Sequence, residues 1–163
     1  MRYPDKLMRV PTATTRPMRP GETQGVGHFF ITEKEAADKI AKGEFLEYFK
    51  YNRYLYGTLL QPVLDALKIG KDVLLEVDVR GAREVLKVFP DTITIFIRAA
   101  DAQELRQRLI DRNTEQLADI EERVAYAEKE LIAAKKEYAH LVVNPTGYPE
   151  RAIAETEHIL GIA

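Results

Sequence analysis

The second half of the chain alternates short, nearly continuous apolar runs with helical patterns. Residues 73–77 and 92–97 form two such runs, and a helix is predicted between them at residues 82–89. Strands of this kind are buried on both faces, because helices cover both sides of a parallel sheet. The pattern therefore predicts an α/β protein built on a parallel sheet.

Helix signals fill much of the remaining chain. The longest predicted helix spans about residues 115–138, where apolar residues recur every three or four positions on one face. Capping-box patterns, Thr32 with Glu35 and Asp101 with Glu104, predict the starts of two more helices. The other predicted elements are strands at 7–10, 28–31, 45–51, 54–58 and 141–143 and a helix at 150–160.

Residues 12–22 are rich in Thr, Pro and Arg. Pro17 and Pro20 each lock φ and remove a donor, so an ordered loop is predicted here. Residues 28–58 are predicted to form a small mixed β unit with one helix. The whole chain of 163 residues is expected to be one α/β domain.

Composition excludes several classes of protein. The 24 Lys and Arg against 26 Asp and Glu argue against a nucleic-acid binder, which normally carries a strong basic excess. Without cysteine there is no thiolate zinc site or cysteine nucleophile, and the three scattered histidines argue against a metal centre. Neither a membrane span nor a secretion signal is visible, so a soluble cytoplasmic protein is the default expectation.

Two groups of residues have the chemistry of a binding site in the first half of the chain. Arg16 and Arg19 flank a Pro-containing turn near the hydroxyl of Thr12, a set suited to bidentate binding of phosphate. The alternative is that these arginines solvate the loop or pair with Glu22. The second group is Glu47, Tyr56 and Thr58. These side chains could bind the edge of a purine base, or they could be ordinary strand residues.

The second half contributes two more groups. Glu76 and Asp78 lie two apart at the end of an apolar strand, where α/β sheets bind ligands, although a solvated strand end is the alternative. Arg112 and Arg123 bracket the start of the long helix and could stabilise a transferring phosphoryl group. Arginines at such positions more commonly pair with surface carboxylates, and the candidates here are Asp119, Glu121 and Glu122.

The segment Thr14 to Glu22 runs T-T-R-P-M-R-P-G-E, which resembles the T-T-R-x-x-R-x-G-E signature of the guanylate kinase family. Further motifs of that family follow in order with familiar spacings. They are G-E-F-L-E at 43–47, Y-G-T at 56–58, L-E-V-D-V-R-G-A at 75–82 and V-V-N at 142–144. The resemblance covers essentially the whole chain from Tyr3 onward.

This resemblance implies a three-layer, parallel-sheet P-loop kinase core. It implies a small mixed β region that binds GMP at about residues 11–59, and a lid with the long helix at about 101–138. The implied reaction is ATP-dependent phosphorylation of GMP to GDP, with GMP and ATP as partners and Mg²⁺ arriving with ATP. Neither nucleic acid nor membrane is implied, and a homo-oligomer remains open.

The resemblance also assigns roles to residues. The residues implied to contact the phosphate of GMP are Arg16, Arg19 and Tyr56, with Thr12 in a hydroxyl position. The residues implied to contact the guanine edge are Glu47, Thr58 and Asp78, and Glu76 lies beside them. Arg112 and Arg123 match the family's lid arginines. One substitution stands out. His28 occupies the position of a phosphate-contacting Tyr, so weaker or pH-dependent GMP binding is expected.

The largest departure is the P-loop, G-x-x-x-x-G-K-[ST], which the sequence does not contain. Only Gly70 precedes a Lys, and Asp72 follows where the motif needs a hydroxyl. By resemblance the first residues match the end of the family's first helix, so the first strand and the P-loop are expected to be missing upstream. Three interpretations remain open: a guanylate kinase whose sequence as given starts late, a P-loop-less GMP binder, and a protein-interaction module of the same fold.

Overall fold

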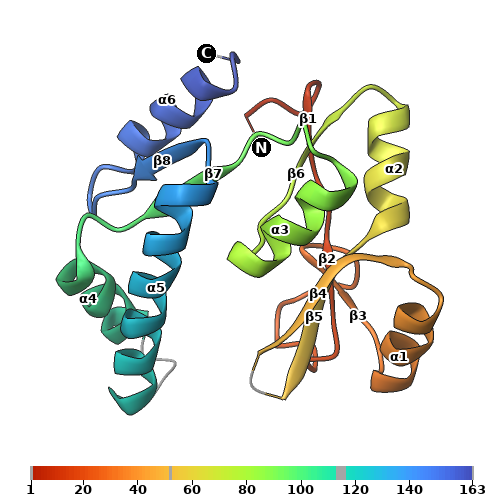
Figure 1. Cartoon of the computed structure of the whole chain (residues 1–163). Coiled ribbons are helices and arrows are strands. Elements are labelled where there is room, and N and C mark those ends of the chain that lie inside the picture. Colours follow the sequence, from red (N-terminus) through yellow and green to blue (C-terminus); the bar gives the residue numbers. More distant parts are fainter. Residues whose placement is uncertain (1, 52, 113–116, 163) are drawn as a thin grey trace. The chain divides into compact units, whose positions relative to one another are not determined.

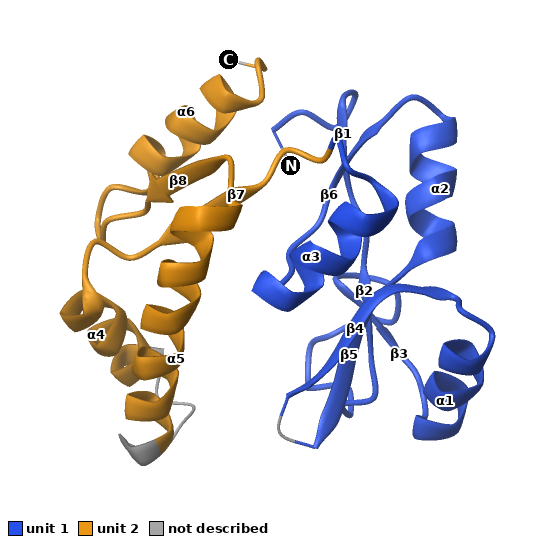
Figure 2. Cartoon of the chain, in the orientation of Figure 1, with its two compact units in different colours: residues 1–91 blue, residues 92–163 orange. Residues whose placement is uncertain are grey.

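The computed structural model describes residues 2–51, 53–112 and 117–162. Figure 1 shows the order of the elements along the chain, six helices and eight strands among the described residues. The chain divides into two compact units, which are coloured separately in Figure 2: residues 1–91 form unit 1 and residues 92–163 form unit 2. Each unit is described by itself.

Unit 1 contains a parallel strand pair, β1 (Leu7–Arg9) with β6 (Asp72–Leu74). Two helices accompany this pair: α2 (Leu60–Lys68), which contacts β6, and α3 (Val79–Val88). A parallel sheet was predicted, but no partner was named for residues 7–10, and the predicted runs at 73–77 and 92–97 contribute to separate two-stranded sheets. Strand β6 is also shorter than the predicted strand at 73–77. The core of the unit is a cluster of buried side chains that links these elements: Val10, Leu46, Val63 and Val85.

Helix α2 was missed by the sequence analysis. It begins directly after strand β5, and its N-cap residue Leu59 makes no side-chain hydrogen bond to the helix. A cap without a polar side chain leaves no start signal in the sequence. Pro62 lies in the first turn, where a missing backbone N–H costs little.

Unit 1 also contains a mixed four-stranded sheet in the order β3-β2-β5-β4. Strand β2 pairs parallel with β3 and antiparallel with β5, and β4 and β5 form an antiparallel hairpin. The strands are β2 (Thr12–Thr14), β3 (His28–Phe30), β4 (Phe45–Tyr51) and β5 (Tyr54–Leu59).

The prediction of a loop over all of residues 12–22 was wrong at its start. Thr12–Thr14 form a strand between β3 and β5, and Ala13 and Thr14 are fully buried. The prolines come later, so they do not prevent pairing there. Two threonine hydroxyls tie this strand to β5: Thr14 Oγ1 donates to the Leu55 carbonyl at 2.8 Å, and the Leu55 N–H donates to Thr15 Oγ1 at 2.9 Å.

Helix α1 (Glu33–Ala41) begins with the predicted capping box. The Thr32 hydroxyl accepts from the Glu35 N–H at 3.1 Å, and the Glu35 carboxylate accepts from the Thr32 N–H at 2.7 Å. Both orphan donors at the helix start are thereby satisfied. The prediction made from the Thr32-to-Glu35 spacing is confirmed.

Unit 2 pairs β7 (Ile95–Arg98) with β8 (His140–Val143) in parallel; both strands were predicted, but their pairing was not. Three helices accompany them: α4 (Ala102–Arg112), α5 (Leu117–Glu137) and α6 (Pro149–Ile159). The predicted apolar stripe of α5 is confirmed at its described positions, which are buried or half-buried while Ile132 off the stripe is exposed. These positions are Ile120, Val124, Ala127, Leu131, Ala134 and Tyr138.

The close pairing of β4 with β5 depends on Gly57. A Cβ added there would lie 2.6 Å from the Glu47 carbonyl oxygen and 2.7 Å from the Tyr48 Cβ. We therefore expect Gly57→Ala to lower the free energy of unfolding by about 1–3 kcal/mol, because it forces the two strands apart. Urea unfolding should show this loss, whereas Lys50→Ala, at an exposed position of β4, should change the midpoint little. Equal stability of the two variants would contradict the packing described here.

Candidate functional site

Most of the residues predicted for a site in the first half of the chain lie on one face of the four-stranded sheet. Glu47 pairs with Thr58, and two residues further along Phe49 pairs with Tyr56. Because side chains alternate between the faces of a strand, these four side chains share one face. The same face continues onto β2 and β3, where Thr14 lies beside Tyr56 and Thr12 lies beside His28.

Glu47 is the buried carboxylate of this face, with 3% of its surface exposed. The Thr58 hydroxyl donates to Glu47 Oε1 at 2.7 Å, while Glu47 Oε2 is buried without a hydrogen-bond partner. Burial raises the pKa of Glu47 above its usual range, and the nearby charge of Asp78 raises it further, although the bonds from Thr58 oppose the shift. An acceptor in this state is suited to a ligand that brings N–H donors.

A glycine lets helix α3 approach this carboxylate. A Cβ added at Gly81 would lie 3.0 Å from Glu47 Oε2, closer than side chains normally pack. The first turn of α3 is fixed by Asp78, whose Oδ1 accepts from the Gly81 N–H at 2.8 Å. Asp78 and Glu47 are thereby brought to the same place from different elements, as the guanine-edge prediction required.

Glu76 has a different partner from Asp78. Its carboxylate forms an ion pair with Arg9 of the neighbouring strand β1, with Arg9 Nε 3.1 Å from Oε1, and both side chains are more than half exposed. This matches the alternative of a solvated strand end. The structure therefore does not group Glu76 with the buried carboxylate.

Arg16 is largely buried at the start of the loop, with 8% exposure. Its two terminal nitrogens form a fork on Glu22, with distances of 2.9 and 2.8 Å, and its guanidinium lies 5.3 Å from the centre of the Phe30 ring. The Arg19 N–H donates to the same carboxylate at 2.6 Å, whereas the Arg19 side chain is exposed. The pairing of Arg16 with Glu22, one of the two alternatives, is present, and it orders the loop that carries Arg19.

This arrangement shifts the pKa of Glu22 strongly. The hydrogen bonds from the Arg16 side chain and from the Arg19 backbone lower the pKa of Glu22 to about 2. Glu22 in turn raises the pKa of Arg16, and Tyr56 contributes to the same shift. Tyr56 therefore lies close enough to Arg16 to interact with it, as expected if both face one ligand.

Three residues in or beside this face of the sheet were missed by the sequence analysis: one on β4 and two on helix α3. Phe49 stacks on Tyr56 with ring centres 5.9 Å apart, and the Arg80 guanidinium lies 5.5 Å from the centre of the Phe49 ring. The third is Gly81. The alternation of the strand could have identified Phe49, since it lies two residues after Glu47, but Arg80 and Gly81 enter only through the packing of α3.

His28, the substitution noted in the sequence, lies at the edge of the sheet. Its ring is 5.8 Å from the Phe30 ring in an edge-on arrangement, and its Nδ1 is buried without a hydrogen-bond partner. Its cross-strand neighbour is Thr12, so the two residues assigned to the phosphate end share one register position. Whether His28 contacts a phosphate stays a prediction.

The two arginines that the resemblance assigns to a lid belong to unit 2. Arg112 is the last residue of α4, but its side chain and residues 113–116 lie outside the described part of the chain. Arg123 is half-buried on α5. One of the carboxylates considered as its partner, Glu121, forms an ion pair with Arg106 of α4.

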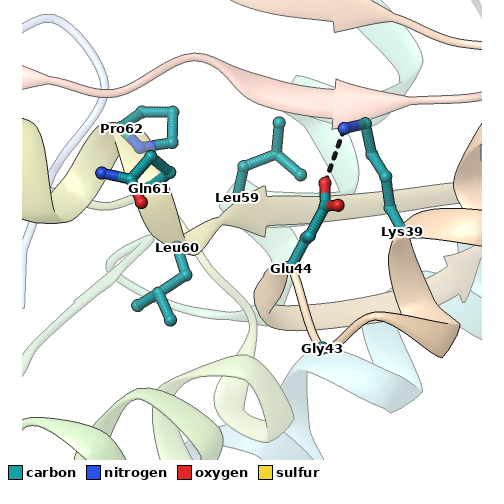
Figure 3. Close-up of a pocket in the computed structure, with 7 residues that line it drawn as sticks. All are labelled: Lys39, Gly43, Glu44, Leu59, Leu60, Gln61 and Pro62. Atoms are coloured by element: carbon teal, nitrogen blue, oxygen red, sulfur yellow. Dashed lines mark hydrogen bonds and ion pairs between the residues drawn. The ribbon is translucent and has the colours of Figure 1, made fainter.

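Unit 1 also has a hollow of about 460 Å³, away from the residues predicted for the site (Figure 3). It lies between the end of α1 and the start of α2, and an ion pair of Lys39 with Glu44 at 2.8 Å spans one side. Leu59, Leu60 and Pro62 line the rest. Its lining includes Gly43 and Glu44 of the G-E-F-L-E motif but none of the residues predicted to contact a ligand.

The described part of the chain contains neither a metal-binding cluster of side chains nor a membrane-spanning helix. Within ranges 2–51, 53–112 and 117–162, no three His, Cys, Asp or Glu side chains gather closely enough to hold a metal ion. Of the helices in those ranges, none has the length and apolar character needed to cross a membrane.

The fold is that of an α/β P-loop kinase. The structure matches the crystal structure of guanylate kinase from Anaplasma phagocytophilum with a TM-score of 0.74, over 95% of this chain and 74% of that one, at 24% sequence identity. At this sequence identity, the similarity establishes the fold alone.

The sequence comparisons identify the family. The family model for guanylate kinase matches residues 1–159. The guanylate kinase of Coxiella burnetii is 42% identical over 147 residues, which cover 90% of this chain and 70% of the relative. That of a Synechococcus species is 39% identical over 159 residues, 98% of this chain and 71% of the relative. The chain belongs to the guanylate kinase family.

The fork between Arg16 and Glu22 gives a pH-dependent prediction. Because the pKa of Glu22 is lowered from 4.5 to about 2, ionised Glu22 stabilises the fold above about pH 4.5, and this stabilisation is lost as the pH falls towards 2. We expect Glu22→Gln to be less stable than the native chain at pH 7, with a difference that shrinks between pH 4.5 and 2. Chemical unfolding across this range measures it, with Glu84→Gln, from an exposed pair with Lys87, as the control. A difference that stays constant with pH would contradict the role given to Glu22.

Proposed function

We propose that the sheet face of unit 1 binds GMP, and that the reaction served by this site is the transfer of a phosphoryl group from ATP to GMP. The observation that carries the proposal is the Glu47 carboxylate, which is buried with one oxygen held by Thr58 and the other without a partner. A buried acceptor left unpaired costs about 1–3 kcal/mol, which a ligand bearing the right donor recovers. The names of the relatives support the same substrate.

Guanine matches this acceptor. Its N1–H and its 2-amino group are adjacent donors on one edge, so they can meet the two oxygens of the Glu47 carboxylate. Asp78, brought beside Glu47 by α3, offers a further acceptor to the 2-amino group. Adenine presents no such pair of donors and would leave the carboxylate unpaired, so the site discriminates between the two purines.

The phosphate end of GMP is assigned to the loop after β2. Arg16 is largely committed to Glu22, so we assign it the task of holding the loop and contributing positive charge. Arg19 has an exposed side chain and a backbone anchored on Glu22, which presents its guanidinium to a phosphate. The Tyr56 hydroxyl and the side chains of Thr12 and His28 lie on the same face of the sheet and complete the set.

In the transfer itself, an oxygen of the GMP phosphate attacks the γ-phosphorus of ATP. The bond from that phosphorus to the β,γ-bridging oxygen breaks, and ADP leaves as GDP forms. Arg112 and Arg123 are assigned to the phosphates of ATP and the group in transfer, where their charge offsets the negative charge of the oxygens.

The reaction class also uses Mg²⁺, which neutralises charge on the ATP phosphates when it is bound. The described residues supply no cluster of three ligands for such an ion. The ion is therefore assigned to the co-substrate, and no step is derived through it.

A second candidate function is GMP binding without transfer. The observation that favours it is the sequence itself, which contains no G-x-x-x-x-G-K-[ST] loop to hold ATP. Both functions need the same GMP site. They differ in whether a phosphate-binding loop acts together with it.

The GMP site is tested by titration calorimetry with GMP and AMP. We expect the chain to bind GMP at least about tenfold more tightly than AMP, because one well-placed pair of base contacts contributes about 1–3 kcal/mol of discrimination. Glu47→Gln should lose this preference, because an amide turns a donor towards the donors of guanine. Equal affinity of the native chain for GMP and AMP would overturn the assignment of Glu47.

The stability of the same variant separates binding from folding. The raised pKa means that the folded state holds the Glu47 proton more tightly than the unfolded state does. The stability that protonated Glu47 gives the folded state is fully present below the ordinary pKa of 4.5, and it is lost as the pH rises through the pKa of the folded state. Glu47→Gln should therefore be more stable than the native chain at pH 8, by a margin that shrinks in acid, while GMP preference is lost. Loss of both stability and binding would indicate a purely structural Glu47.

The transfer step is tested with a coupled assay for ADP release. We expect the chain of 163 residues to show essentially no ATP-dependent phosphorylation of GMP, because nothing in its sequence forms the amide cradle and Lys of a P-loop. A strand, a P-loop and a helix added ahead of residue 1 should restore turnover. In that extended protein, Arg123→Ala should lower kcat more than it weakens GMP binding. Robust turnover by the unextended chain would contradict this account, and an inactive extended protein that still binds GMP would favour the second function.

A further inference from the structure

The Asp78 carboxylate is held from two sides. Its Oδ1 accepts from the Gly81 N–H at 2.8 Å, which caps helix α3. Its Oδ2 accepts from Arg80 twice, from Nε at 2.9 Å and from Nη2 at 2.7 Å. The side chain of Asp78 is 17% exposed and that of Arg80 is 56% exposed. The arginine therefore covers the outer side of a carboxylate that is itself mostly buried.

The Arg80 guanidinium also rests on the sheet. It lies 5.5 Å from the centre of the Phe49 ring, and Phe49 stacks on Tyr56. The register continues this line across all four strands, from Tyr56 to Thr14 and from Thr14 to Phe30. We call Phe49, Tyr56, Thr14 and Phe30 the cross-strand row.

Each end of the cross-strand row carries a guanidinium. Arg80 lies over Phe49 at one end, and Arg16 lies over Phe30 at the other. Each of these arginines is also paired with a carboxylate, Asp78 for Arg80 and Glu22 for Arg16. An arginine held by both an aromatic ring and two hydrogen bonds to a carboxylate has little freedom of position. Arg80 therefore ties the start of α3 to β4.

We propose that Arg80 is a positioning residue, which fixes the Asp78 carboxylate against the cross-strand row and thereby sets the preference of the site for guanine over hypoxanthine. The inference rests on the proposed GMP site. It adds a residue that has no direct contact with the base and acts through Asp78.

The available lone pairs explain why position matters here. A carboxylate oxygen has two acceptor sites, and both sites on Asp78 Oδ2 are taken by Arg80. One site on Oδ1 is taken by the Gly81 N–H, which leaves one acceptor site for a ligand. With Arg80 in place this remaining site has a fixed direction. Without Arg80 the carboxylate keeps only its capping bond and can turn about it.

Hypoxanthine lacks the donor assigned to Asp78. It keeps the N1–H that Glu47 can accept, but it lacks the 2-amino group of guanine. GMP and IMP therefore share the phosphate, the ribose and one base donor, and they differ in the 2-amino group, which is assigned to both Glu47 and Asp78. Because Glu47 is the same in the native chain and in a variant of Arg80, a change in the ratio of affinities between these two proteins reports on the direction of the Asp78 acceptor.

The ordinary alternative is that Arg80 with Asp78 is an exposed ion pair of little consequence. Pairs of that kind contribute little to stability. The alternative predicts that removal of Arg80 leaves the ratio of GMP to IMP affinity unchanged. The two interpretations therefore differ in binding selectivity.

The experiment uses the full chain and titrates GMP and IMP at one pH and one salt concentration. We expect Arg80→Gln to lower the ratio of GMP to IMP affinity by about three- to tenfold, because the bond from the 2-amino group to Asp78 is weakened and not removed. Arg83→Gln is the matched control, since it removes the same charge from an exposed position of the same helix and should leave the ratio within twofold of the native value. Thermal unfolding of both variants verifies that they are folded.

Two further variants sharpen the result. Arg80→Lys keeps the charge but cannot place two donors on one oxygen, so it should restore only part of the ratio. Phe49→Leu keeps the bonds to Asp78 but removes the ring, and should lower the ratio less than Arg80→Gln does.

The inference is overturned if Arg80→Gln keeps the native ratio within twofold, or if Arg83→Gln lowers it equally. A native chain that fails to prefer GMP over AMP would instead overturn the proposed GMP site, which distinguishes the two failures.

Discussion

The pairing register between β4 and β5 is the constraint on which the rest of this face depends. Glu47 lies opposite Thr58 because the register shifts between Phe45 and Glu47, where β4 has one residue more than its partner strand. In a strand, a slip of one residue sends every side chain to the other face. The irregularity therefore decides that a carboxylate, and not its apolar neighbour Leu46, faces Thr58. Gly57 holds that register, because no larger residue fits against the facing strand.

The sequence predicted elements that carry their own local signals. Helix α1 has a reciprocal cap between Thr32 and Glu35, and α5 has an unbroken apolar stripe, so both were found from pattern alone. Helix α2 begins at a residue without a capping side chain and was missed. Strand β2 was taken for a loop, because three residues are too few to show alternation and its pairing partners are far away in sequence.

The residues of the candidate site also divide into those that the sequence indicated and those that only the structure revealed. Arg16, Arg19 and Glu47 were visible because their residue types and spacing suit a nucleotide, and a family signature strengthened the prediction. Phe49 and Arg80 were not singled out, although each lies two residues after a predicted site residue, because each contributes through a contact between separate elements. The structure shows one of the two alternatives for Arg16, its pairing with Glu22, and the proposed phosphate site is compatible with that pairing. Its pairing with Glu22 gives the loop a fixed form, and a loop of fixed form is what a ligand-binding arginine requires.

The unpaired oxygen of Glu47 also has a consequence for the lifetime of the protein. A fold that carries a buried acceptor without a donor is less stable than its packing alone would make it, and a bound donor removes that deficit. By mass action, any ligand that binds only the folded chain raises its resistance to unfolding as the ligand becomes more abundant. Because proteases degrade the unfolded form, the proposed binding of GMP would slow the degradation of this chain as GMP becomes more abundant. The carboxylate proposed to read the base would then also couple the lifetime of the protein to the supply of that base.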